Sequence, residues 1–113
     1  LITCVEAQEQ GIGELVQRIV NRVGDEKVFV TFDIDFVDPA FAPGTGTPEV
    51  GGFTSREALQ VVRGLKGLNL IGFDLVEVLP QYDPSQVTAL LGANIVYEFV
   101  SLIALRKKLA SEG

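Results

Sequence analysis

The stretch Lys27-Val-Phe-Val-Thr-Phe-Asp-Ile-Asp35 decides the fold class of this chain of 113 residues. Its β-branched and aromatic side chains predict a strand, and the lack of polar alternation is typical of a strand that helices cover on both faces. Upstream of it, apolar residues recur every three or four positions between Gly11 and Val23. This spacing predicts an amphipathic helix, which Gly24 and Asp25 end.

Two more strands and a second helix are expected around this unit. The apolar runs Leu1–Val5 and Leu68–Val76 predict buried strands. Thr54 and Glu57 stand three residues apart, as in a capping box, and they predict a helix that runs to about Lys66. Strands and helices therefore alternate along the chain, which predicts the α/β class with a parallel sheet.

The C-terminal part is expected to be one long helix. Pro80–Asp83 is rich in turn residues, and Asp83 followed by Pro84 matches an N-cap and the first residue of a helix. From there a mostly apolar helix is predicted to run towards Leu109, and its apolar girth predicts burial against a sheet or a partner. Residues 1–113 then form a single domain.

The predicted sheet is small for a complete fold. Three strands leave exposed edges, and the chain has no methionine and begins at Leu1. We therefore expect a fragment of a longer protein, with N-terminal processing as the alternative.

The composition excludes several classes of protein. Lys and Arg number 9 against 15 Asp and Glu, which gives a net charge of −6, and 47% of the residues are hydrophobic. These values predict a globular protein and argue against nucleic-acid binding. The apolar runs predict neither a membrane span nor a signal peptide. A single cysteine, Cys4, allows no internal disulfide and suits the cytoplasm, and the absence of histidine removes the commonest transition-metal ligand.

Acidic residues lie where two of the predicted strands end. Asp33 and Asp35 are two positions apart in a segment expected to be extended, so both should point to one face, roughly 6–7 Å apart. Asp38 follows them, and Asp74 and Glu77 lie on and after the strand near residue 70. Parallel strands would gather these carboxylates at one edge, where hard cations such as Mg²⁺, Ca²⁺ or Mn²⁺ bind. The alternative is that the first three aspartates only cap turns and solubilise a loop.

Residues 32–52, Phe-Asp-Ile-Asp-Phe-Val-Asp-Pro-Ala-Phe-Ala-Pro-Gly-Thr-Gly-Thr-Pro-Glu-Val-Gly-Gly, closely resemble the C-terminal signature of the ureohydrolase family, which includes arginases and agmatinases. Thr31 stands where Ser is usual in that signature, and it keeps a hydroxyl. Gly72-Phe-Asp-Leu-Val-Glu-Val-Leu-Pro80 resembles a second family segment, at the expected distance. The sequence around Glu49 resembles agmatinases more than arginases.

The resemblance implies a three-layer α/β/α fold with a parallel sheet, of which this chain would be the C-terminal portion. It implies a binuclear manganese centre at the strand ends, with Asp33 and Asp35 among the Mn²⁺ ligands. It further implies that Glu77 binds the cationic end of the substrate and that Thr47 lies beside the substrate. For Asp74 two interpretations stay open: it orients a neighbouring ligand, or it makes a buried structural hydrogen bond.

The activity implied by the resemblance is the manganese-dependent hydrolysis of a guanidino compound to urea and an amine, with agmatine as the expected substrate. In this reaction a metal-bridging hydroxide attacks the guanidinium carbon. The implied setting is polyamine biosynthesis by a cytoplasmic homo-oligomer. The family also uses histidine ligands from its N-terminal half, and this chain has none. We therefore expect the chain alone to be inactive and to need that missing half as its partner. The alternative is a truncated, non-enzymatic binding or assembly module.

Overall fold

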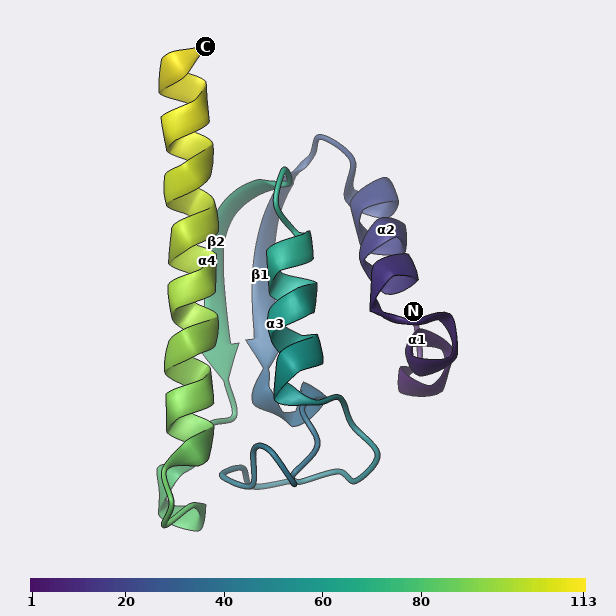
Figure 1. Ribbon diagram of the computed structural model, residues 1–113, viewed down its shortest axis with the longest axis vertical. Coiled ribbons are helices and arrows are strands. Elements are labelled where there is room, and N and C mark those ends of the chain that lie inside the picture. Colours follow the sequence, from purple (N-terminus) through teal and green to yellow (C-terminus); the bar gives the residue numbers. More distant parts are fainter.

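The computed structural model describes residues 1–113 and contains a parallel two-stranded sheet (Figure 1). Strand β1 (Lys27–Asp33) pairs with β2 (Asn69–Val76), and helix α3 (Ser55–Gly64) lies between them in the sequence. The predicted α/β class with parallel strands is therefore confirmed. The strands contain β-branched and aromatic residues in near-continuous runs, which favour the extended backbone.

The N-terminal residues form a helix, so the strand predicted at Leu1–Val5 is wrong. Helix α1 (Cys4–Gln10) begins after Thr3, whose hydroxyl accepts the N–H of Glu6, while the Glu6 carboxylate accepts the N–H of Thr3. This reciprocal capping box starts a helix despite the apolar residues around it. The sheet consequently has two strands instead of three. Helix α2 (Ile12–Val23) follows as the spacing predicts.

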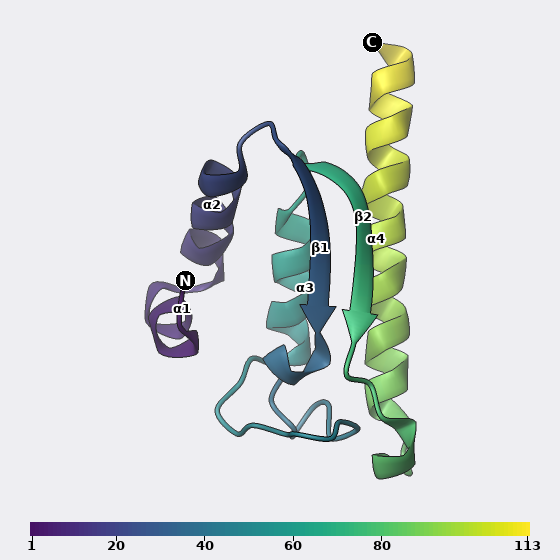
Figure 2. The same ribbon diagram turned by 180° about the vertical axis from the view of Figure 1, so that it is seen from behind.

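The helices pack on one face of the sheet. Figure 2, seen from behind, shows β1 and β2 in front of α3 and of helix α4 (Val87–Glu112). Phe73 of β2 stacks on Phe99 of α4 with 4.8 Å between ring centroids, and Phe99 is fully buried. The main core lies between this face and the helices, and it includes Phe32, Ile34, Val62, Leu70, Leu91 and Ile95.

No residue of this chain covers the opposite face of the sheet. Phe29 of β1 remains 55% exposed and Ile71 of β2 remains 61% exposed. Gly72 lies beneath the Phe29 ring, because a Cβ on Gly72 would come within 2.9 Å of two ring carbons. The expectation that helices cover both faces is thus met on one face only within these residues.

Helix α4 begins three residues later than predicted. Pro80–Tyr82 forms a 3-10 helix, and Gln86, in the left-handed region with φ of 61°, is the residue from which α4 starts. Pro84 is therefore not the first helical residue. Asp83 is not the N-cap either, although its carboxylate accepts the N–H of Thr88 in the first turn at 2.7 Å.

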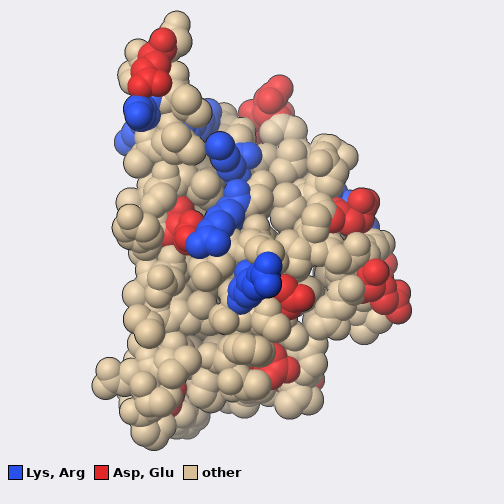
Figure 3. Space-filling model, viewed as in Figure 1, with Lys and Arg blue, Asp and Glu red and all other residues tan.

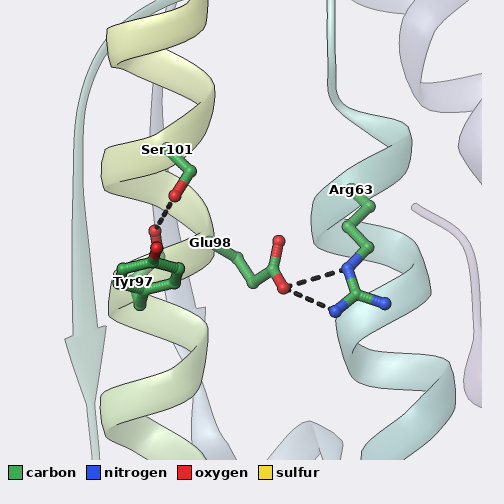
Figure 4. Close-up of polar contacts among 4 residues, drawn as sticks. All are labelled: Arg63, Tyr97, Glu98 and Ser101. Carbon is green, nitrogen blue, oxygen red and sulfur yellow. Dashed lines mark hydrogen bonds and ion pairs between the residues drawn. The ribbon is translucent and has the colours of Figure 1, made fainter.

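Helix α4 bears on the expectation that the chain has no membrane-spanning segment. Its 26 residues are apolar enough, by length and composition, to cross a membrane, although no such segment was expected. In this structure α4 packs along the sheet, and Glu98 in its middle binds Arg63 of α3 through the guanidinium Nε and Nη2 (Figure 4). The helix is therefore part of the packed domain.

Candidate functional site

The two strands end side by side at one edge of the sheet. Asp33, the last residue of β1, is the register partner of Val76, the last residue of β2. The loop formed by residues 37–53 and the segment 77–86 lie at this same end of the molecule (Figure 1). The carboxyl ends of the strands, where α/β proteins place their ligands, are thus together as predicted.

The chain turns sharply immediately after β1. The carboxylate of Asp33 accepts the N–H of Asp35 at 2.8 Å, and residues Ile34–Phe36 form a 3-10 helix. Ile34 is fully buried and anchors this turn in the core. The expectation that Asp33 and Asp35 share one face of an extended strand is therefore wrong, because an aspartate that bonds the backbone two residues on favours a turn.

Asp35 has one satisfied and one unsatisfied carboxylate oxygen. Its Oδ2 accepts the hydroxyl of Thr47 at 2.9 Å, which joins the turn to the long loop. Its Oδ1 is buried and has no hydrogen-bond partner. A buried carboxylate oxygen without a donor is costly, so this atom fits a position beside a cation. The side chain also borders a cleft of about 590 Å³ between α1 and the loop.

Asp33 faces different surroundings from Asp35. It is exposed and borders a second cleft, of about 360 Å³, between α2, β1 and α3. No group of three His, Cys, Asp or Glu side chains in the chain lies close enough together to hold a metal ion. The chain therefore offers carboxylate oxygens of the kind that hard cations bind, and it does not offer a complete set of ligands.

Asp38 organises the long loop. Its carboxylate accepts the backbone N–H of Ala40 at 2.8 Å and that of Gly51 at 2.9 Å, and these bonds lower the pKa of Asp38. A Cβ on Gly52 would lie 2.8 Å from the Asp38 nitrogen, so glycine is required where the two ends of the loop meet. For Asp38 the interpretation as a turn cap agrees with these contacts.

Glu77 and Asp74 are exposed and form no side-chain hydrogen bond or ion pair. Glu77 follows β2 directly with φ of 69°, a strained backbone for a residue other than glycine. Asp74 is the register partner of Thr31 and lies on the uncovered face of the sheet, so it is not a buried structural residue here. Thr47 bonds to Asp35 and not to Glu77.

Sequence reasoning missed a buried polar residue, Thr88 of α4. Its side chain is fully buried, and its hydroxyl accepts the N–H of Gly44 at 2.7 Å. The carboxylate of Asp83 accepts the Ser85 hydroxyl and the Thr88 N–H, and these bonds lower the pKa of Asp83 to about 2. The one available signal was a threonine placed within an apolar run just after the predicted cap.

The segments that form the end of the molecule where the strands finish contain no basic residue. Residues 33–55 and 67–105 contain no Lys or Arg. The two ion pairs of the structure, Arg63–Glu98 and Lys108–Glu112, involve α3 and α4. In Figure 3 the Lys and Arg side chains gather higher up, over α3 and α4, and none appears at the lower end of the molecule. The carboxylates at the strand ends are therefore not neutralised within the chain, which favours a cationic ligand.

The lowered pKa of Asp83 makes the stability of the chain depend on pH. A carboxyl group whose pKa falls from 3.8 to about 2 on folding stabilises the fold above pH 4. This contribution is lost as the pH falls through the folded value. We expect Asp83→Asn to remove this part of the acid sensitivity in urea denaturation between about pH 6 and about pH 2. Asp25→Asn, a change in an exposed turn, should keep the wild-type pH dependence; an equal effect of both changes would contradict the role of Asp83.

Known proteins resemble the chain both in sequence and in fold. A model of the arginase family matches residues 1–101. An agmatinase from Enterobacter sp. (strain 638) is 48% identical over 102 residues, which cover 90% of this chain and 33% of that protein.

Two solved structures are similar along most of the chain. A protein described as a hypothetical agmatinase from Burkholderia thailandensis has a TM-score of 0.91 at 48% identity, covering 95% of this chain and 34% of its own. The proclavaminate amidino hydrolase of Streptomyces clavuligerus has a TM-score of 0.86 at 45% identity, covering 88% and 34%. The chain therefore spans about a third of the length of the proteins that it matches. These likenesses confirm both the resemblance found in the sequence and the α/β fold that it implied.

Proposed function

The chain belongs to the arginase family, and from that premise we propose that it is the C-terminal part of an agmatinase-like ureohydrolase. The proposed reaction is the metal-dependent hydrolysis of a guanidino compound, agmatine, to urea and an amine. The chain would contribute part of the site, and the N-terminal part of the same fold would contribute the rest. By itself the chain is proposed to be inactive.

The observation that carries this proposal is the buried, unpartnered Oδ1 of Asp35 at an end of the molecule without basic side chains. We propose that Asp35 and Asp33 hold divalent metal, with Mn²⁺ as the ion that the family resemblance indicates. A bound divalent metal supplies a water nucleophile that is deprotonated at neutral pH. The remaining ligands would come from the N-terminal part, since this chain contains no histidine.

Glu77 is the proposed partner of the guanidinium group. A guanidinium presents paired N–H donors, and a carboxylate accepts two of them in a charge-assisted pair. The Glu77 carboxylate is exposed and unpaired, and it lies directly beyond the strand end. Thr47 is proposed to lie beside the substrate while its hydroxyl holds Asp35. Asp74 is proposed to orient a neighbouring group from the uncovered face of the sheet.

Similarity to agmatinases supports agmatine as the substrate. Glu49 borders the same cleft as Asp35 and adds a second carboxylate to it, which suits a substrate that is cationic at both ends. Similarity to the proclavaminate amidino hydrolase of Streptomyces clavuligerus supports hydrolysis of an amidino group at the Glu77 end of the site.

We also propose that the protein assembles with further copies of itself in the cytoplasm. Five large apolar side chains of α4 are exposed, those of Val87, Leu90, Tyr97, Val100 and Leu109. The same surface supports the second candidate function, a non-enzymatic assembly module. The coding sequence upstream of Leu1 distinguishes the two, because the enzyme requires an in-frame segment that supplies histidine ligands.

Removing either proposed metal ligand should abolish activity. In the full-length protein, Asp33→Asn or Asp35→Asn should lower agmatine hydrolysis by more than about 100-fold, because loss of a direct ligand costs more than loss of a supporting partner. Bound manganese, measured by atomic absorption, should fall in parallel, while Asp25→Asn keeps both. Turnover at the wild-type rate in either variant would overturn the assignment.

Glu77→Gln should separate substrate binding from metal binding. The amide oxygen accepts hydrogen bonds from the guanidinium N–H groups less strongly than a carboxylate does. KM for agmatine should therefore rise about 10- to 100-fold. Manganese content should stay at the wild-type value, and Glu26→Gln, an exposed change in a turn, should alter neither quantity. Loss of manganese in Glu77→Gln would show that Glu77 is a metal ligand instead.

A further inference from the structure

One buried chain of hydrogen bonds joins the two segments that carry the proposed substrate-binding residues. The N–H of Leu79 donates to the carbonyl of Gly44 at 2.7 Å, and the N–H of Gly44 donates to the hydroxyl of Thr88 at 2.7 Å. The N–H of Thr88 donates in turn to the carboxylate of Asp83 at 2.7 Å. Gly44 lies three residues before Thr47, and Leu79 lies two residues after Glu77.

The loop backbone lies directly against the first turn of α4. A Cβ on Gly44 would come within 2.9 Å of Asp83 Cβ and of Thr88 Cβ and Oγ1. Thr88 is fully buried and Asp83 is 2% exposed, and Gly44 is buried between them. The neighbouring Thr45 is also buried, with its hydroxyl unpartnered. Solvent therefore has no ready access to replace the Thr88 hydroxyl as the acceptor for Gly44.

We propose that Thr88 is a positioning residue for the substrate site. Its hydroxyl fixes Gly44, and through Gly44 it fixes the distance between the loop that carries Thr47 and the segment that carries Glu77. This inference rests on the proposed function for the identity of the substrate, although the hydrogen-bonded connection itself does not. The turn that holds Asp33 and Asp35 is closed by its own bond, from the N–H of Asp35 to Asp33, although the Thr47 hydroxyl of the loop also donates to Asp35.

The strained backbone of Glu77 explains why such a connection is needed. A residue other than glycine keeps a φ of 69° only where the surrounding structure holds it. The bond from Leu79 to Gly44 is the backbone hydrogen bond closest in sequence after Glu77. When Gly44 is released, the segment is free to relax, and the Glu77 carboxylate loses its fixed place relative to Thr47.

The test compares three variants of the full-length protein. Thr88→Val keeps the shape of the side chain and removes the acceptor, whereas Thr88→Ser keeps the hydroxyl. Ser101→Ala is the matched control, because the Ser101 hydroxyl donates only to the Tyr97 carbonyl within α4, at 2.8 Å (Figure 4). Agmatine kinetics at saturating Mn²⁺ are measured together with hydrogen exchange of peptides that cover residues 41–47 and 77–82.

In Thr88→Val we expect KM to rise about tenfold with kcat changed by less than about twofold, since one buried hydrogen bond is lost. Both peptides should exchange faster, while Thr88→Ser and Ser101→Ala match the wild type. Unchanged KM with faster exchange would overturn the positioning role, and unchanged exchange would overturn the connection itself. If Thr88→Val does not fold, Thr88→Ala is judged by the same measurements. A wild-type protein without turnover would refute the proposed function, while the exchange data would still test the connection.

Discussion

Parallel pairing of β1 with β2 is the constraint on which the candidate site depends. The register sets Asp33 opposite Val76, so the residues that follow each strand emerge side by side at one edge of the sheet. Stacking of Phe73 on Phe99 and the burial of Phe32 hold this pair of strands against the helices. The strand pairing places Asp33 and Asp74 directly, and it sets where the segments that carry Asp35 and Glu77 begin.

Short polar contacts determine the conformation of the chain beyond the strand ends. Asp33 ends β1 by accepting the N–H of Asp35, and the fully buried Ile34 locks the turn that follows. The Thr47 hydroxyl then ties the loop to Asp35. Since no Lys or Arg occurs in residues 33–55 or 67–105, the carboxylates keep their negative charge unneutralised, and a cation is the ligand that this end of the molecule favours.

The regular elements with strong local signals could be predicted from the sequence. The spacing in α2, the capping box of Thr54 and Glu57, and the apolar runs of β1 and β2 each specify their structure within a few residues. At residues 1–5 the apolar run was misleading, because the capping box of Thr3 and Glu6 outweighs it. The start of α4 was placed too early because a proline after an aspartate also suits the 3-10 turn that precedes this helix.

The site was less accessible to sequence reasoning than the fold. The positions of Asp33 and Asp35 depend on the hydrogen bond from the N–H of Asp35 to the Asp33 carboxylate. The alternation of side chains along an extended strand does not predict this bond. The role of Thr88 depends on Gly44, which lies 44 positions away in the sequence, and no local pattern reports such a contact. The proposed roles of Asp33, Asp35 and Glu77 rest on the family resemblance together with the surroundings described above.

The central claim is that this chain holds carboxylate ligands of a metal site that it cannot complete alone. A calorimetric titration of the 113-residue chain with Mn²⁺ at neutral pH tests it most directly. We expect weak binding that disappears in Asp35→Asn. Tight, stoichiometric binding by the chain would contradict it, because the carboxylates would then build a metal site without any histidine.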